Sequence, residues 1–294
     1  MTFLSFGDFI VAHHVAREMV RTGDPLHPFR GIEPLLRSVD FSFANLESPL
    51  DKKRGSIEQE TAGIIEFDFR VLNLANNHAM DRAREGLWYT IDELAKRGVA
   101  TTGAGRDLDE AWKPAIVEHE GIRIAFLGAS YTSVNSSRLL LNPYVARIDQ
   151  RRRLRLAVAT AKNEADFVVV AMHAGIEYTS WPSAEQQLFA QAAIRHGADV
   201  VIGSHPHVLQ PIRHYRGKPI FHSLGNFIFD QRRPPAVKLT AAVRTELRRD
   251  GDRLVSAITV IPIINDDITT PRVAQGEDAI RILRRMGLDG PEVD

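Results

Sequence analysis

Five apolar runs, each followed at once by polar residues, constrain the fold of this chain more than any other feature. They are Thr2–Phe6, Val39–Ala44, Phe69–Ala75, Phe167–Met172 and Val200–Ile202. Short continuous runs rich in β-branched and aromatic residues are typical of the buried strands of parallel sheets. Because α/β proteins bind ligands beyond the carboxyl ends of such strands, we expect the polar residues that follow the runs to meet at one sheet edge.

The polar residues at these strand ends are of the kinds that bind divalent metal ions. In chain order they are Asp8, Glu47, Asn77 with His78, His173, and the pair His205 and His207. A carboxylate can bridge two cations, and imidazole is the commonest protein ligand for borderline divalent ions. The sequence therefore predicts a site for two metal ions, with a bridging carboxylate and terminal imidazoles.

Each of these residues also has an ordinary structural role that the sequence leaves open. Asp8 could cap the helix after it, since Asp is a favoured N-cap residue. Glu47 could lie in a surface turn, and Asn77 in a turn closed by its own side chain. His173 could be a hydrogen-bonded core histidine, and a His-x-His pair can arise by chance in a chain with 11 histidines. The repetition at five strand ends favours the metal site.

A series of short motifs runs in order along residues 2–231. They are Gly7-Asp8, Asn45-Leu46-Glu47, Ala75-Asn76-Asn77-His78, Gly103-Ala104-Gly105, His173-Ala174-Gly175 with Glu177-Tyr178, Gly203-Ser204-His205-Pro206-His207 and Gly225-Asn226-Phe227. The series resembles that of the CapA (poly-γ-glutamate capsule) family, which is similar to a branch of the calcineurin-like metallophosphoesterases. The resemblance implies an α/β fold of that type, with two packed β-sheets flanked by helices in α-β-β-α layers.

The resemblance also implies a dinuclear centre of two divalent ions, with Mn, Zn or Fe as the expected metals. It makes Asp8 a ligand of the first ion and Glu47 the carboxylate that bridges both ions. The other implied ligands are Asn77, His173 and His205 for the second ion and His207 for the first.

The resemblance implies that His78 is the catalytic residue, which faces the substrate as a proton donor or transition-state stabiliser. The residues expected to bind substrate or support the site are Asn76, Asp81, Glu177, Tyr178 and Asn226. Asp81 is also the residue before an amphipathic run that starts at Arg82, and this position favours a helix cap over a catalytic role.

The chain departs from the wider superfamily at Ile10, where calcineurin-like enzymes usually carry a histidine two residues after the first aspartate. The first ion would lose a ligand there and bind more weakly. His13 or His14 could replace it, although both lie at the start of an expected helix, Ala12–Arg21. Residues 51–63 are expected to form an exposed loop.

The remaining pattern predicts alternating helices and strands with two hairpins. Helices are expected at Ala83–Arg97, Asp107–Trp112, Asp149–Lys162 and Ala184–His196. The hairpins pair Pro114–Glu118 with Arg123–Leu127, and Lys238–Leu247 with Leu254–Ile261. Residues 1–262 are expected to form one metallophosphoesterase-type domain. Residues 263–294 would then pack on it, as a tether within 262–275 followed by a helix at Glu277–Met286.

Composition limits the partners. The chain has 294 residues with 37 basic and 37 acidic side chains, so no net charge favours nucleic acid or an anionic membrane as a partner. The densest basic cluster, Arg151–Arg155, would favour an acidic substrate only if it lay beside the site. The absence of cysteine excludes thiolate ligands and disulfides. No stretch approaches the roughly 20 apolar residues of a membrane span, and the first ten residues lack a signal-peptide pattern, so we expect a cytoplasmic protein.

Together these features predict a metal-dependent hydrolase or transferase that acts on an amide or phosphoester bond. The expected substrate is a small molecule or a peptide-like chain, such as a γ-glutamyl polymer. Two alternatives stay open. One is a CapA-like binding or assembly protein without turnover, and the other is a cytoplasmic biosynthetic enzyme for an amino-acid-derived small molecule. The sequence gives no oligomeric state.

Overall fold

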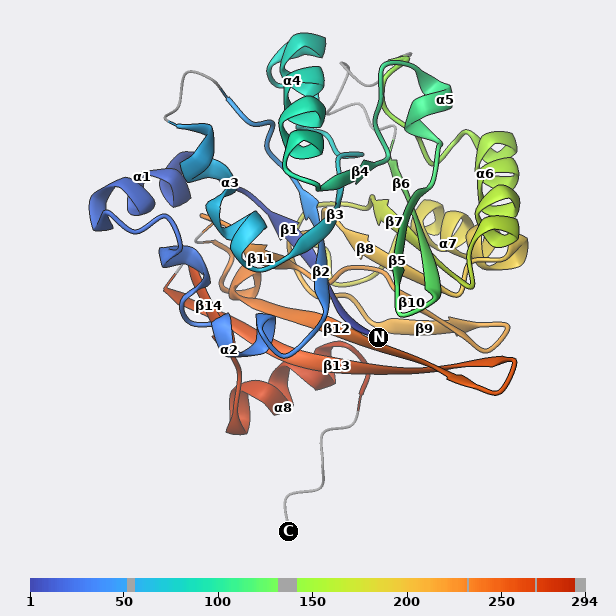
Figure 1. Cartoon of the computed structure of the whole chain (residues 1–294). Coiled ribbons are helices and arrows are strands. Elements are labelled where there is room, and N and C mark those ends of the chain that lie inside the picture. The colour runs from blue at the N-terminus through green and yellow to red at the C-terminus, as the bar shows by residue number, and fades with distance from the viewer. Residues whose placement is uncertain (52–55, 132–141, 232, 268, 289–294) are drawn as a thin grey trace.

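Two β-sheets lie face to face, with helices on their outer sides (Figure 1). The structure is a computed structural model that describes residues 1–51, 56–131, 142–231, 233–267 and 269–288. Among these residues no helix combines the length and the apolar character that crossing a bilayer would require. The arrangement has the α-β-β-α layers expected from the sequence.

The first sheet has the strand order β14-β13-β12-β1-β2-β3-β4, and β11 pairs with β1 beyond this path. Strands β1 to β4 are parallel, whereas β12, β13 and β14 form an antiparallel extension. The strand bounds are β1 Thr2–Phe9, β2 Phe41–Leu46, β3 Phe69–Asn73, β4 Ala100–Thr102, β11 Asn226–Ile228, β12 Leu239–Asp250, β13 Arg253–Asp267 and β14 Thr270–Val273.

The second sheet has the order β5-β6-β7-β8-β10-β9. Its central strands β6, β7, β8 and β10 are parallel. At the edges, β5 forms an antiparallel hairpin with β6, and β9 forms one with β10. The bounds are β5 Ala115–His119, β6 Ile122–Ser130, β7 Phe167–His173, β8 Val200–Ser204, β9 Ile212–Tyr215 and β10 Lys218–Phe221.

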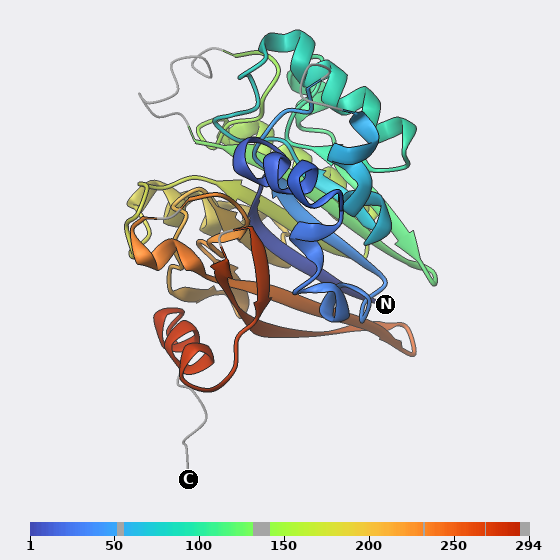
Figure 2. The same cartoon turned by 90° about the vertical axis from the view of Figure 1, so that its left-hand side faces the viewer.

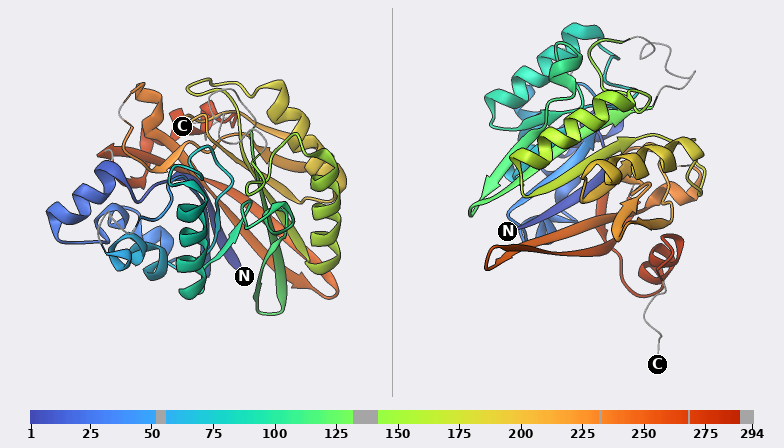
Figure 3. Two further views of the ribbon diagram at one scale, coloured as in Figure 1. Left: turned by 90° about the horizontal axis from the view of Figure 1, so that it is seen from above. Right: turned by 90° about the vertical axis from the view of Figure 1, so that its right-hand side faces the viewer.

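Helices cover both outer faces. They are α1 His13–Thr22, α2 Glu33–Leu36, α3 Ile57–Glu66, α4 Ala83–Lys96, α5 Leu108–Ala111, α6 Arg151–Glu164, α7 Ala184–His196 and α8 Gly276–Arg285. Figure 3 shows α6 and α7 side by side along the outside of the second sheet. Figure 2 shows α8 below β12 and β13, against which it packs.

Successive side chains of a strand point to opposite faces of its sheet, so each space between two layers contains its own hydrophobic core. On β6, Phe126 faces the first sheet, whereas its neighbours Ala125 and Leu127 face α6 and α7. Aliphatic and phenylalanine side chains fill the space between the sheets, where Phe3 stacks on Phe41 with ring centroids 5.1 Å apart. A side-chain period of two on strands buried on both faces produces this division.

Two sequence predictions about local structure are wrong. In the segment 51–63, expected as an exposed loop, residues 52–55 lie outside the described part, and Ile57 to Gly63 belong to α3. Ser56 caps this helix by accepting a hydrogen bond from the Gln59 backbone, and Ile64 of the helix is buried. The tether expected at 262–275 is instead the end of β13 and the whole of β14. Ile264 pairs with Leu239 there and is buried, because burial between layers outweighs the polar character of the surrounding sequence.

The close approach of β1 and β11 generates a stability prediction. A Cβ atom on Gly7 would lie 2.0 Å from the carbonyl oxygen of Gly225. Gly7→Ala should therefore lower the free energy of unfolding in urea by about 1–3 kcal/mol, the usual cost of overpacking. Gly251→Asn is the control, since that residue lies in open space with a φ of 60° that Asn tolerates. Equal stability of both variants would contradict the packing argument.

Candidate metal centre

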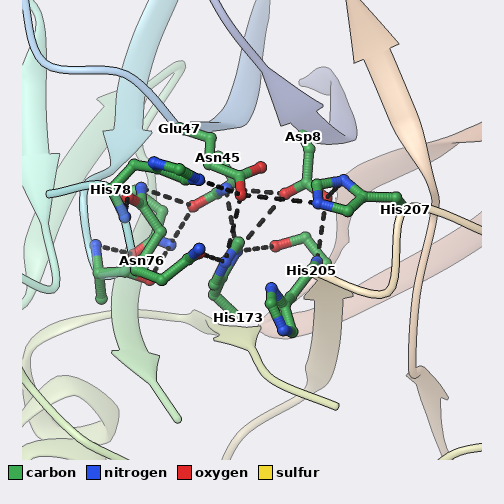
Figure 4. A network of polar contacts seen from close by, with 12 residues as sticks. Asp8, Asn45, Glu47, Asn76, His78, His173, His205 and His207 are labelled. Carbon is green, nitrogen blue, oxygen red and sulfur yellow. Dashed lines mark hydrogen bonds and ion pairs between the residues drawn. The ribbon is translucent and has the colours of Figure 1, made fainter. Parts of the chain in front are cut away.

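Strand ends of both sheets bring five titratable side chains together in the interior (Figure 4). Asp8 lies within β1, Glu47 follows β2, and His173 ends β7. His205 and His207 follow β8. None of the five is more than 3% exposed. The convergence of strand ends expected from the sequence is therefore present, although β1 continues to Phe9, so that Asp8 is a strand residue and not a helix cap.

The donor atoms fall into two groups that share one carboxylate. Asp8, Glu47 and His207 place their donor atoms within 4.8 Å of one another, and so do Glu47, His173 and His205. A carboxylate common to two donor groups is the arrangement that a bridging ligand requires.

The bonding state of Glu47 tests whether these residues fit metal ions. Both of its carboxylate oxygens are buried without a hydrogen-bond partner, and the nearest imidazole nitrogen, Nε2 of His173, lies 3.6 Å from Oε1. Nδ1 of His205 is also buried and without a partner. Unsatisfied buried carboxylates are costly. Ions bound between these groups would satisfy them, so the donor set fits divalent cations that accept oxygen and nitrogen ligands.

The pKa values of the two carboxylates are shifted in opposite directions. Burial raises the pKa of Asp8, but hydrogen bonds and charge interactions with His173 and His207 outweigh burial and hold this pKa well below its ordinary value. Burial, together with the neighbouring charge of Asp8, raises the pKa of Glu47 well above its usual range.

The imidazoles differ as well. Burial and the nearby His173 and His207 lower the pKa of His205 to about 2, and burial also lowers the pKa of His173. Burial acts in the same direction on His207, but bonding to Asp8 reverses the balance and raises its pKa. His173 and His205 are thus held neutral, the form that binds metal.

A network of buried amides, which the sequence analysis did not identify, orients these ligands. The side chain of Asn45 donates to Oδ1 of Asp8 at 2.8 Å and approaches Nδ1 of His173 at 3.1 Å. Asn73 in turn donates to Oδ1 of Asn45 at 2.7 Å. Asn73 is a polar residue within an otherwise largely apolar strand, and this position was the one sequence signal for a buried amide. The structure shows that Asn73 is fully buried.

The two neighbouring asparagines have different positions. Asn76 is fully buried, and its side-chain amide donates to the Leu46 carbonyl at 2.8 Å, which ties the loop after β3 to the end of β2. Oδ1 of Asn77, predicted as a ligand of the second ion, lies 2.7 Å from Nε2 of His173. It is therefore adjacent to the group formed by Glu47, His173 and His205.

His78 stands at the edge of the centre with its side chain 41% exposed, and Nε2 lies 3.9 Å from Oε1 of Glu47. Its Nδ1 lies 2.8 Å from Oδ2 of Asp81. The expectation that Asp81 caps the next helix is wrong, because the N-cap of α4 is Arg82. The carboxylate of Asp81 instead fixes the ring of His78.

Three predicted residues surround His207. Oδ1 of Asn226 lies 2.8 Å from Nδ1 of His207, which leaves Nε2 directed toward Glu47. The ring of Tyr178 lies 6.2 Å from that of His207. Glu177 forms a further donor group with His205 and His207. No sequence pattern pointed to Tyr131, whose ring stacks on His205 at a centroid distance of 4.3 Å.

A cavity of about 280 Å³ opens onto the centre. Its lining includes Glu47, His78, Glu177 and His207. Ile10, 2% exposed, forms an apolar part of the wall. The volume suits the reacting part of a substrate, so a longer molecule would extend outside it.

Of the two histidines considered as replacement ligands, His13 lines the cavity but belongs to none of the donor groups among the described residues. His14 lies 3.9 Å from Glu18 on its own helix. Neither is placed as a ligand of the first group.

Comparison with protein families gives a match over residues 2–231 to the bacterial capsule synthesis protein PGA_cap. The PGA biosynthesis protein CapA of Bacillus subtilis is 35% identical in an alignment 239 residues long that covers 76% of this chain and 62% of that protein. The capsule biosynthesis protein CapA of Bacillus anthracis is 31% identical over 310 residues, covering 98% of this chain and 73% of that protein. The chain thus spans less than two thirds of the first relative.

Solved structures support the fold. A putative 5'-nucleotidase from Staphylococcus aureus matches with a TM-score of 0.57 at 15% identity, over 97% of this chain and 57% of that chain. The NAD nucleotidase of Haemophilus influenzae matches with a TM-score of 0.54 at 13% identity, over 99% and 56%. The two packed sheets are therefore those of the metallophosphoesterase fold.

The amide network generates a prediction about metal affinity. Asn45→Ala removes the donor shared by Asp8 and His173, and loss of such a supporting residue usually weakens metal binding about 10–100-fold. Calorimetric titration of the metal-free protein with Mn²⁺ would measure the loss. Asn163→Ala, at an exposed position on α6, should bind as the wild type does. An unchanged affinity in Asn45→Ala would show that the network does not position the ligands.

The raised pKa of Glu47 predicts a pH dependence. The metal-free carboxyl group keeps its proton to a higher pH than an ordinary glutamate, and a bound ion must displace that proton. Affinity for Mn²⁺ should therefore rise as pH rises, with proton release that titrations in buffers of different ionisation enthalpy can count. Binding without proton release would contradict this.

Proposed function

Because the chain belongs to the bacterial capsule synthesis protein family, we propose that it is a metal-dependent hydrolase or transferase with a dinuclear centre. The observation that carries the proposal is Glu47. This carboxylate belongs to two donor groups and is buried with neither oxygen hydrogen-bonded. A purely structural role would leave the burial of that carboxylate uncompensated.

In the proposed centre each ion has its own set of residues and shares Glu47. The first ion would be held by Asp8 and His207, and the second by Asn77, His173 and His205. Two divalent ions in such a site acidify water and polarise the bond under attack. Asn45 and Asn226 keep Asp8 and His207 in their binding orientation through the contacts described above.

His78 is the proposed proton donor to the leaving group. Its contact with Asp81 holds Nδ1, so that Nε2 is the nitrogen available toward the cavity. A carboxylate bonded to an imidazole fixes the orientation of the ring. The exposed edge of the ring allows a substrate to reach it without opening the core.

The proposed substrate is a peptide-like or amino-acid-derived chain whose amide bond is cleaved or transferred to another amine. The names of the two Bacillus relatives, which concern poly-γ-glutamate (PGA) and capsule biosynthesis, support this class. The nucleotidases that share the fold make a phosphoester the competing bond. The proposal involves neither nucleic acid nor a membrane as partner.

A second candidate function is a binding or assembly module without turnover. Ile10 favours it, since a buried apolar side chain lines the cavity at the position where the wider superfamily usually has a histidine. A relative in Mycobacterium tuberculosis, 32% identical over 173 residues, is named a probable polyglutamine synthesis accessory protein. That alignment covers 54% of this chain and 45% of the relative.

His78→Asn distinguishes the two functions. Its ring is not in either donor group, so the variant should retain its metal, measured by mass spectrometry of the purified protein. Turnover of γ-glutamyl amides or p-nitrophenyl phosphate should fall about 100–10,000-fold, the usual contribution of a general acid. His119→Asn, on β5, is the control and should keep full turnover. A wild-type protein that binds no Mn²⁺ or Zn²⁺ would refute the hydrolase.

A further inference from the structure

A third donor group lies at the entrance to the metal centre. Glu177, His205 and His207 place their donor atoms within 4.8 Å of one another. His207 also belongs to the group with Asp8 and Glu47. A carboxylate oxygen of Glu177 therefore lies within 4.8 Å of a nitrogen of His207, a residue that the proposed centre assigns to the first ion. Nδ1 of His205, which is buried and without a hydrogen-bond partner, is a second sign that this side of the centre takes a ligand.

The loop that carries Glu177 is held against the histidine pair. The backbone N–H of Tyr178 donates to the carbonyl of Pro206, the residue between the two histidines, at 2.8 Å. Tyr178 has a φ of 62°, a left-handed backbone conformation that non-glycine residues rarely adopt. A Cβ atom on Gly175 would lie 2.9 Å from Cγ of Pro206, so the loop is tightly packed there. Glu177 is thus presented to the centre by a fixed segment, although its own side chain is exposed.

The two proposed ions have unequal ligand sets without Glu177. The second ion would have three residues of its own besides Glu47, whereas the first would have only Asp8 and His207. Ile10 is an apolar part of the wall and offers no donor. A carboxylate on the cavity side would give the first ion three ligand residues besides Glu47, as many as the second ion has.

We propose that Glu177 is a protein ligand of the first ion. This inference rests on the dinuclear centre described under Proposed function and adds a residue from the loop after β7 to it. The first ion would then be held by Asp8, Glu47, Glu177 and His207, with Glu177 the ligand nearest the solvent. Binding of the first ion would depend on the position of that loop.

The test is metal binding by Glu177→Gln, which keeps the shape of the side chain and removes its charge. Metal-free wild type and variant are titrated with Mn²⁺ by calorimetry, and the bound ions are counted by mass spectrometry. We expect two ions in the wild type. In the variant one ion should bind with unchanged affinity and the other about 100-fold more weakly, at the upper end of the effect of losing a supporting residue.

Two control variants separate ligation from other effects. Asp230→Asn removes the same charge from the same cavity, and Asp230 belongs to no donor group among the described residues. Glu185→Gln removes an exposed carboxylate in the first turn of α7. Both should keep two ions with affinities within about threefold of the wild type, as expected of weak, screened charge interactions. Equal melting temperatures of the metal-free proteins would show that folding is unaffected.

Each contrary outcome has a distinct meaning. If the wild type binds two ions and Glu177→Gln binds both equally well, Glu177 is not a ligand, but the dinuclear centre stands. If Asp230→Asn weakens the binding of one ion as much as Glu177→Gln does, the effect is one of charge alone and the proposal is overturned. A wild type that binds no ion would overturn this inference together with the proposed function.

Discussion

The burial of Asp8 and Glu47 between the two sheets is the constraint around which the centre is organised. A buried carboxylate is costly unless it is paired or bound to a cation. Asp8 obtains partners from Asn45 and two imidazoles, and its pKa is held low. The side-chain carboxylate of Glu47 has no hydrogen bond, and its pKa is raised. The contrast shows which of the two carboxylates the protein itself satisfies, and it makes Glu47 the group whose burial depends most on a bound cation.

Backbone strain accompanies this arrangement. His205 and His207 have φ values of 96° and 58°, a region that costs a non-glycine residue about 1–3 kcal/mol. The strand before them offsets that cost by burial, and Gly203 allows close contact, because a Cβ atom there would lie 2.0 Å from the His222 carbonyl. A metal site whose ligands lie on strained backbone needs a rigid support. The parallel strands of both sheets, buried on each face, provide it.

Much of this organisation could be predicted from the sequence, because apolar periodicity and ligand chemistry are local properties. The strand ends, the metallophosphoesterase fold and the bounds of α7 agree with expectation. The errors have a common cause. The segment with α3 and the segment with β14 are polar and lack strong periodicity, and they are ordered by contacts with distant residues, as in the pairing of Ile264 with Leu239. The position of Asp81 beside His78 likewise depends on how the loop after β3 folds.

By itself, the sequence determined which side chains stand at the ends of the strands and therefore which chemistry the centre can have. A run of β-branched residues followed by Asp, Glu or His specifies this locally. Only the tertiary structure decided how the donors are shared: that Glu47 belongs to two groups, that Asn45 and Asn73 hold the ligands, and that Glu177 reaches the histidine pair. These relations join residues far apart in the chain, and only the packing of one sheet on the other brings them within bonding distance.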